Sequence, residues 1–255
     1  MTGLPYMFLP GLALAAWSLG KDRLPCLIVL ALMFPVLGLI ALNMLEVALM
    51  RRRAMVGMYL RDDSWLSRLL SRKMFLMLWQ VVKATLFTFV LFLEALDWPP
   101  WFWWVLLANA ILMYTIHGWL RALLHTQVKP GQSGVIARRI LVTVNTLLLA
   151  LLLASGQMFE KQIAYKNMSW QETVLHAAQQ ERLACDLMSP LARLQAVQHA
   201  LAGRFVHQGL ESFDNAWSRI AGWLLFFFWS ALSLWAWNRA LLGTLIRRPD
   251  FAGAG

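Results

Sequence analysis

The sequence predicts an all-α, polytopic integral membrane protein with about six transmembrane helices and one external helical insertion. Of its 255 residues, 60% are hydrophobic and only 14% are charged, whereas soluble proteins usually carry about 25% charged residues. Apolar runs close to the ~20 residues needed to cross a bilayer recur along the chain. Short basic segments separate several of these runs, and their position indicates which helix ends face the cytoplasm.

The segment 51–73 sets the orientation of the predicted helices. It carries seven Lys or Arg residues against two acids, Asp62 and Asp63, and long apolar runs flank it on both sides. Because Lys and Arg resist translocation, a short basic segment between two membrane-length runs belongs on the cytoplasmic face.

Residues 1–45 are expected to form an N-terminal transmembrane hairpin. Residues 4–19 are barely long enough to span and contain Pro10, so a re-entrant or interfacial segment is the alternative to a full crossing. Residues 24–45 form a clear span, and Pro35 should kink it because proline removes one backbone donor and clashes with the preceding turn.

Residues 46–73 are expected to form a cytoplasmic, basic amphipathic segment that lies on the anionic inner leaflet of the bilayer. Met55, Tyr59, Trp65 and other apolar residues recur there at helical spacing, a pattern typical of helices in the membrane interface. A docking face for a cytoplasmic partner is the alternative. The basic residues expected at the membrane surface are Arg51, Arg52, Arg53, Arg61, Arg68, Arg72 and Lys73.

Residues 74–159 are expected to contain the third, fourth and fifth transmembrane helices. The segment 97–104 holds two prolines and four tryptophans between the third and fourth helices. Trp prefers the membrane–water interface, so this segment marks the face opposite to segment 51–73. The loop 121–139 carries four basic residues and no acid, as expected of a cytoplasmic loop.

Residues 160–219 are predicted to be an external, periplasmic helical region, in which six basic and six acidic residues balance. Two amphipathic helices are expected to meet at Ser189-Pro190. The second carries an apolar stripe that includes Leu191, Leu194 and Val197. The two helices should pack on each other and on the membrane part.

Residues 220–255 are expected to form the sixth transmembrane helix and a cytoplasmic C-terminus. The predicted cytoplasmic segments carry seven, four and three Lys or Arg residues, and the external segments carry two and six. This bias predicts that both termini are cytoplasmic. A bacterial inner membrane is the expected location.

Motifs of familiar catalytic and cofactor sites do not occur in the sequence. HExxH, GxxxxGK[ST] and GxSxG are all absent, so no zinc-protease site, Walker A loop or nucleophile elbow is predicted. His176, His199 and His207 are interpreted as surface residues. No metal or other cofactor is expected, because the histidines lack the partners that complete a ligand set.

Several polar residues fall inside predicted spans. Lys83 lies about nine residues from the start of the third span, near the midplane of a ~30 Å hydrocarbon core, where a lysine is costly. The candidate intramembrane polar face comprises Gln80, Lys83, Glu94, Asn109 and Asn145. We expect this face to point into the bundle or toward a partner subunit, with Asn109 or Asn145 as the contact of Lys83. The alternative is a lysine that snorkels with only a structural cost.

The two cysteines, Cys26 and Cys185, are predicted to lie on the same external face. A disulfide could persist there if that face is an oxidising periplasm, and it would close a loop of about 160 residues. The alternative is two free cysteines in buried positions, because nothing in the sequence guarantees their proximity.

Three classes of function are compatible with these features. The first is a non-enzymatic, multi-pass inner-membrane subunit, assembly factor or scaffold of a larger envelope complex, whose partners are other membrane subunits or further copies of the chain. The second is a small transporter or channel that uses the polar face around Lys83, and the third is an intramembrane enzyme with an unfamiliar site. Nucleic-acid binding is not expected, because the net charge of +10 is largely explained by topology and no nucleic-acid motif occurs.

Overall fold

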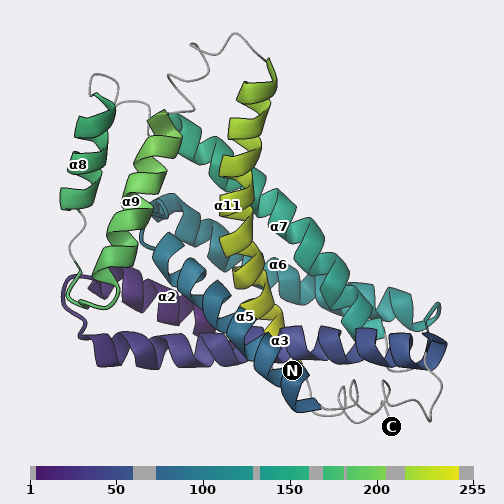
Figure 1. The fold of residues 1–255 in the computed structure, drawn as a ribbon. Helices are drawn as coiled ribbons and strands as arrows, with labels where there is room; N and C mark the ends of the chain where they lie inside the picture. The colour runs from purple at the N-terminus through teal and green to yellow at the C-terminus, as the bar shows by residue number, and fades with distance from the viewer. Residues whose placement is uncertain are drawn as a thin grey trace.

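A computed structural model of the chain describes residues 4–59, 73–128, 133–160, 169–180, 183–204 and 216–246, and every regular element in these ranges is an α-helix (Figure 1). The predicted all-α class is therefore confirmed. Four of these helices are long and apolar enough to cross a membrane, within Cys26–Arg51, Leu76–Glu94, Pro100–His125 and Ser133–Gly156. The chain thus has the architecture of an integral membrane protein, with four supported spans where the sequence predicted about six.

The N-terminal segment forms two short helices, α1 (Leu4–Met7) and α2 (Leu9–Gly20). Pro10 occupies the first turn of α2, where proline costs no hydrogen bond. Twelve residues at ~1.5 Å each cover about 18 Å, well short of a ~30 Å core. The expectation that residues 4–19 form a full span therefore has no support, and α2 has the length of the re-entrant alternative.

Helix α3 runs without interruption from Cys26 to Tyr59, past Pro35. The sequence predicted that this span ends near residue 45 and that a separate surface segment, 46–73, follows. The helix continues because residues 46–59 contain no proline, so Arg51–Arg53 extend the same helix beyond its apolar part. Arg61, Arg68 and Arg72 lie outside the described residues.

Four more long helices complete the membrane part: α5 (Lys73–Glu94), α6 (Pro100–His125), α7 (Ser133–Glu160) and α11 (Ala216–Gly243). Helix α11 packs on α3, α5 and α7. It is not among the four supported spans, and part of its N-terminal half lies outside the residues whose side chains the structure describes.

The core lies where α2, α3, α5, α6, α7 and α11 meet. Trp17 of α2 is fully buried there, and its indole Nε1 donates a hydrogen bond to the carbonyl oxygen of Phe92, 2.8 Å away. This carbonyl lies in the last turn of α5, where the backbone amide of Leu96 bonds to Leu93 instead. The indole therefore satisfies an acceptor that a helix end would otherwise leave unpaired.

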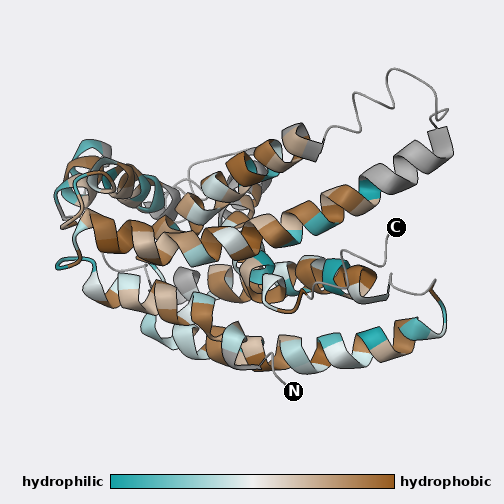
Figure 2. Cartoon of the chain, turned by 90° about the horizontal axis from the view of Figure 1, so that it is seen from below, coloured by the Kyte–Doolittle hydropathy of each residue, from teal (hydrophilic) through white to brown (hydrophobic). Residues whose placement is uncertain are grey.

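The outward faces of the long helices carry rows of exposed apolar side chains. Examples are Leu30 and Phe34 of α3, Val82 and Leu86 of α5, and Leu148 of α7. Figure 2 shows these long helices as largely hydrophobic along their length. Large exposed apolar surfaces are rare on soluble monomers, so these faces suit contact with lipid.

Helices α8 (Trp170–Gln180) and α9 (Ser189–Arg204) pack against each other beside the long helices (Figure 1). A capping box starts α8, because the Ser169 hydroxyl accepts from the Glu172 amide at 3.2 Å and the Glu172 carboxylate accepts from the Ser169 amide at 2.6 Å. Helix α9 starts at Ser189-Pro190, as the sequence predicted.

Candidate functional site

The face of α9 that packs on the membrane helices is partly polar. Ala192, Gln195 and His199 are buried and recur at i, i+3 and i+7, a spacing that places them on one side of the helix. They face the end of α5, which α9 contacts. The polar members of this set find their partners there.

Glu94, the last residue of α5, is the centre of this contact and is only 1% exposed. Its Oε2 accepts a hydrogen bond from Gln195 Nε2 at 3.1 Å and lies 3.1 Å from His199 Nε2. The other ring nitrogen of His199, Nδ1, lies 3.2 Å from the carboxylate of Asp97. A carboxylate at a helix C-terminus faces the negative end of the helix dipole, so the groups from α9 stabilise Glu94 where its own helix does not.

The interpretation of His199 as a surface residue was wrong. Its side chain is 8% exposed and lies between two carboxylates. The i, i+3, i+7 spacing of Ala192, Gln195 and His199 is present in the sequence. It does not indicate burial by itself, because the stronger apolar stripe lies on another side of α9. His207 lies outside the described residues, and His176 of α8 is partly buried.

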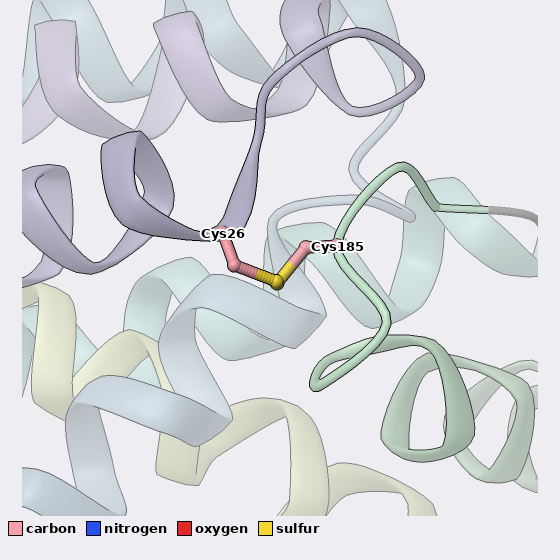
Figure 3. Close-up of a disulfide and its surroundings, with 2 residues drawn as sticks. All are labelled: Cys26 and Cys185. Carbon is pink, nitrogen blue, oxygen red and sulfur yellow. A yellow bond between two sulfur atoms is a disulfide. The ribbon is translucent and has the colours of Figure 1, made fainter.

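A disulfide between Cys26 and Cys185 provides a second link at the same end of the molecule (Figure 3). The two Cα atoms are 4.6 Å apart, within the usual range for a bridge. Cys26 is the first residue of α3, and Cys185 lies in the turn before α9. The amide of Ala184 also donates to the carbonyl of Lys21 at 3.2 Å, so the turn before α9 is fixed to the connection between α2 and α3.

The outer surface of α8 and α9 exposes a group of leucines. Leu175 of α8 is 61% exposed, Leu187 in the turn before α9 is 58% exposed, and Leu194 of α9 is 66% exposed. Leu191 is also exposed. These four exposed side chains, Leu175, Leu187, Leu191 and Leu194, are treated as one proposed binding surface, which we call the leucine patch. The two helices pack on each other and on α5 as expected, while Leu191 and Leu194 of the apolar stripe are exposed.

A second buried polar site joins α3, α7 and α11 at the other end of the long helices. Glu46 of α3 forms an ion pair with Arg138 of α7, and both side chains are buried. Arg239 of α11 donates to the side-chain oxygen of Asn43 at 2.7 Å. Glu46 was not singled out from the sequence, although an acid inside an apolar run is itself a signal of a buried partner.

The residues of the candidate polar face have separate partners. Asn145 of α7 donates to Asn238 of α11 at 2.6 Å, and Asn238 donates to Thr146 at 2.9 Å. The Lys83 ammonium lies 5.1 Å from the ring centre of Trp79, one turn away on α5. Gln80 and Asn109 are buried. The expected contact partner of Lys83 is therefore replaced by a tryptophan of its own helix, and Asn145 serves to join α7 and α11.

Neither a metal centre nor a known relative guides the assignment of function. Among the described residues, no group of three or more His, Cys, Asp or Glu side chains could hold a metal ion. The chain matches no protein-family model, no curated protein and no solved structure. Its function is therefore inferred from its own contacts.

Proposed function

We propose that this chain is a non-enzymatic, multi-pass inner-membrane subunit, assembly factor or scaffold of a larger envelope complex, and that it binds a partner through the leucine patch on α8 and α9. The observation that carries the proposal is the combination of several exposed leucines with a firmly attached inner surface. The disulfide, the Glu94 contacts and the Ala184–Lys21 hydrogen bond fix α9 in place, while Leu175, Leu187 and Leu194 are exposed.

The distribution of charge supports a position of α8 and α9 outside the cytoplasm. The end of the long helices opposite the disulfide carries Arg51, Arg121, Arg138, Arg139 and Arg239, with Glu46 as the acid between them. Basic residues favour the cytoplasmic side. The disulfide end then faces the periplasm, where a disulfide is maintained.

In this topology α11 also crosses the membrane, and the C-terminus is cytoplasmic. Helix α11 is 28 residues long, about 42 Å at ~1.5 Å per residue, which exceeds a ~30 Å core. A cytoplasmic N-terminus requires residues 1–20 to cross completely, and a re-entrant α2 would place the N-terminus on the other side.

Partner binding through the leucine patch has a clear physical basis. Burying one fully exposed leucine contributes roughly 1.5–3 kcal/mol. A surface that is already ordered also loses little conformational freedom on binding. Because α9 is fixed in place, its exposed leucines can bind a protein partner at a lower entropic cost than those of an unattached helix could.

Photo-crosslinking from a single position tests this proposal. A photoreactive phenylalanine analogue at Leu194 should crosslink to one defined polypeptide in intact membranes, whereas the analogue at Leu86, on the exposed face of α5, should crosslink to lipid. The double variant Leu191→Asp and Leu194→Asp should lose stoichiometric co-purification of that polypeptide in mild detergent. Arg23→Asp, at the same end but in another element, should retain it.

Two results would contradict the proposal. Crosslinking of Leu194 to lipid alone would show that the leucine patch lies on the membrane surface. Co-purification that is unchanged by the double variant would show that the patch is not the binding surface.

A further inference from the structure

A groove opens between α5, α7 and α11 on the outside of the membrane part. Its volume is about 350 Å³, and its lining includes Phe87 of α5, Thr143 and Leu147 of α7, and Phe228 and Trp235 of α11. Thr143, Leu147 and Phe228 are exposed, so the groove is open toward the surrounding medium. Ligand sites in proteins commonly have volumes of ~300–1,000 Å³.

Helices α7 and α11, which form two sides of this groove, each carry an arginine near the same end of it. Arg139 lies one turn before Thr143 on α7, and Arg239 lies one turn after Trp235 on α11. Asn145 bonds Asn238, so the two helices lie side by side, and Figure 1 shows that they run in opposite directions. Each arginine is therefore about 6 Å along the helix axis beyond the last lining residue.

The charge of these arginines is not matched by acids in the described part of the chain. Arg51, Arg139 and Glu46 all lie close enough to Arg239 to act on its charge. Glu46 already pairs with Arg138. The Arg239 guanidinium lies 4.4 Å over the ring of Trp235, which lines the groove, and donates to Asn43 of α3. Arg51 and Arg139 each oppose the charge of Arg239, and Glu46 acts in the other direction. We call Arg51, Arg139 and Arg239 the arginine cluster, and their excess of positive charge favours binding of an anion.

We propose that this groove and the arginine cluster form a binding site for one anionic phospholipid. An acyl chain lies against Phe87, Leu147 and Trp235, and the phosphate contacts Arg139 and Arg239. Guanidinium groups bind phosphate through paired, charge-assisted hydrogen bonds, and basic pockets between transmembrane helices bind anionic headgroups. The arginine end is the end assigned above to the cytoplasmic leaflet, which is rich in anionic lipid. The proposal requires a membrane location but not the partner of the leucine patch.

The alternative occupant of the groove is a transmembrane helix of a partner protein. A helix would have to fill the hydrophobic groove and also carry an acid at the level of the arginine cluster. An anionic lipid brings its charge at the headgroup level, where the exposed Arg51 and Arg139 already lie. The combination of a hydrophobic slot with a charged end therefore favours the lipid.

The test uses the full chain in nanodiscs that contain a photoreactive phosphatidylglycerol or the matched phosphatidylcholine. Phosphatidylglycerol should label peptides that contain Thr143–Leu147 and Phe228–Trp235, and phosphatidylcholine should label them at least fivefold less. Excess inorganic phosphate should not prevent labelling, because the acyl chain supplies part of the binding. Arg139→Gln should weaken labelling about fivefold, which corresponds to the ~1 kcal/mol expected per basic residue near a membrane surface.

Two further variants separate the groove from the charges. Thr143→Trp, which fills the groove but leaves the arginine cluster intact, should abolish labelling of both peptides. Arg193→Gln, an exposed arginine on α9, should leave labelling unchanged. Equal labelling by the two lipids, no effect of Arg139→Gln, or crosslinking of a second polypeptide from Thr143 in native membranes would each overturn the proposal.

Discussion

At the scale of single residues, His199 determines how well α9 is attached. It lies between Glu94 and Asp97, and both carboxylates are on the side of α5. Replacing His199 with Ala should leave Glu94 with one fewer partner in a buried position and cost roughly 1–3 kcal/mol of stability. The matched control is Gln198→Ala, on the same helix but less buried.

The measurement for this prediction is limited proteolysis of the protein in detergent. Arg193 is exposed on α9, and trypsin should cut there faster in His199→Ala than in the unchanged protein. Equal cleavage rates in the two variants and in the unchanged protein would mean that the Glu94 contacts do not hold α9.

The ion pair between Glu46 and Arg138 links α3 to α7 at the arginine-rich end of the long helices. Both side chains are buried, so Glu46→Leu or Arg138→Leu alone should destabilise the protein by about 3–5 kcal/mol because an uncompensated charge stays buried. The double variant should be clearly more stable than either single variant. Thermal unfolding in detergent measures this difference, and strictly additive losses would contradict a direct pairing.

At the scale of helices, close packing of α11 on α3 depends on Gly243. A Cβ atom at this position would collide with the backbone carbonyl of Leu39, which cannot move aside as a side chain can. Gly243→Leu should therefore separate the two helices and lower the thermal midpoint by several degrees. Gly38→Leu is the control, because nothing lies within 4 Å of a Cβ added there; similar losses in both variants would argue against this contact.

The disulfide acts on a whole segment, because it ties the turn before α9 to the start of α3. Its cysteines are 159 residues apart, and loop-closure arithmetic for bridges of this length gives about 5 kcal/mol. Cys26→Ser and Cys185→Ser should each increase tryptic cleavage at Arg193 under non-reducing conditions. Unchanged protein treated with a reductant should then be cleaved as fast as the serine variants. If its cleavage stays slow, the other contacts hold α9 without the disulfide, and the prediction is wrong.

At the scale of the whole molecule, apolar periodicity predicted the helical class and the long helices but not how they join. The apolar runs of α3, α5, α6 and α7 were visible because lipid-facing residues have a strong hydropathy signal. The packing of α9 on the membrane part was expected, but its polar contacts were not, because Glu94 meets Gln195 and His199 across separations of 101 and 105 residues, which periodicity cannot report. Apolar spacing also could not show that Leu194 is exposed, because the same spacing occurs on buried and on exposed helix faces.

In the topology that we propose, the disulfide-tethered pair α8–α9 faces the periplasm and the arginine cluster faces the cytoplasm. A membrane-impermeant maleimide applied to intact spheroplasts tests it most directly, with single added cysteines at Gln179 of α8 and His125 at the end of α6. Gln179→Cys should be labelled from outside, and His125→Cys should be labelled only after the membrane is permeabilised. Labelling of Gln179→Cys only after permeabilisation would show that α8 and α9 face the cytoplasm, and the proposed orientation would be wrong.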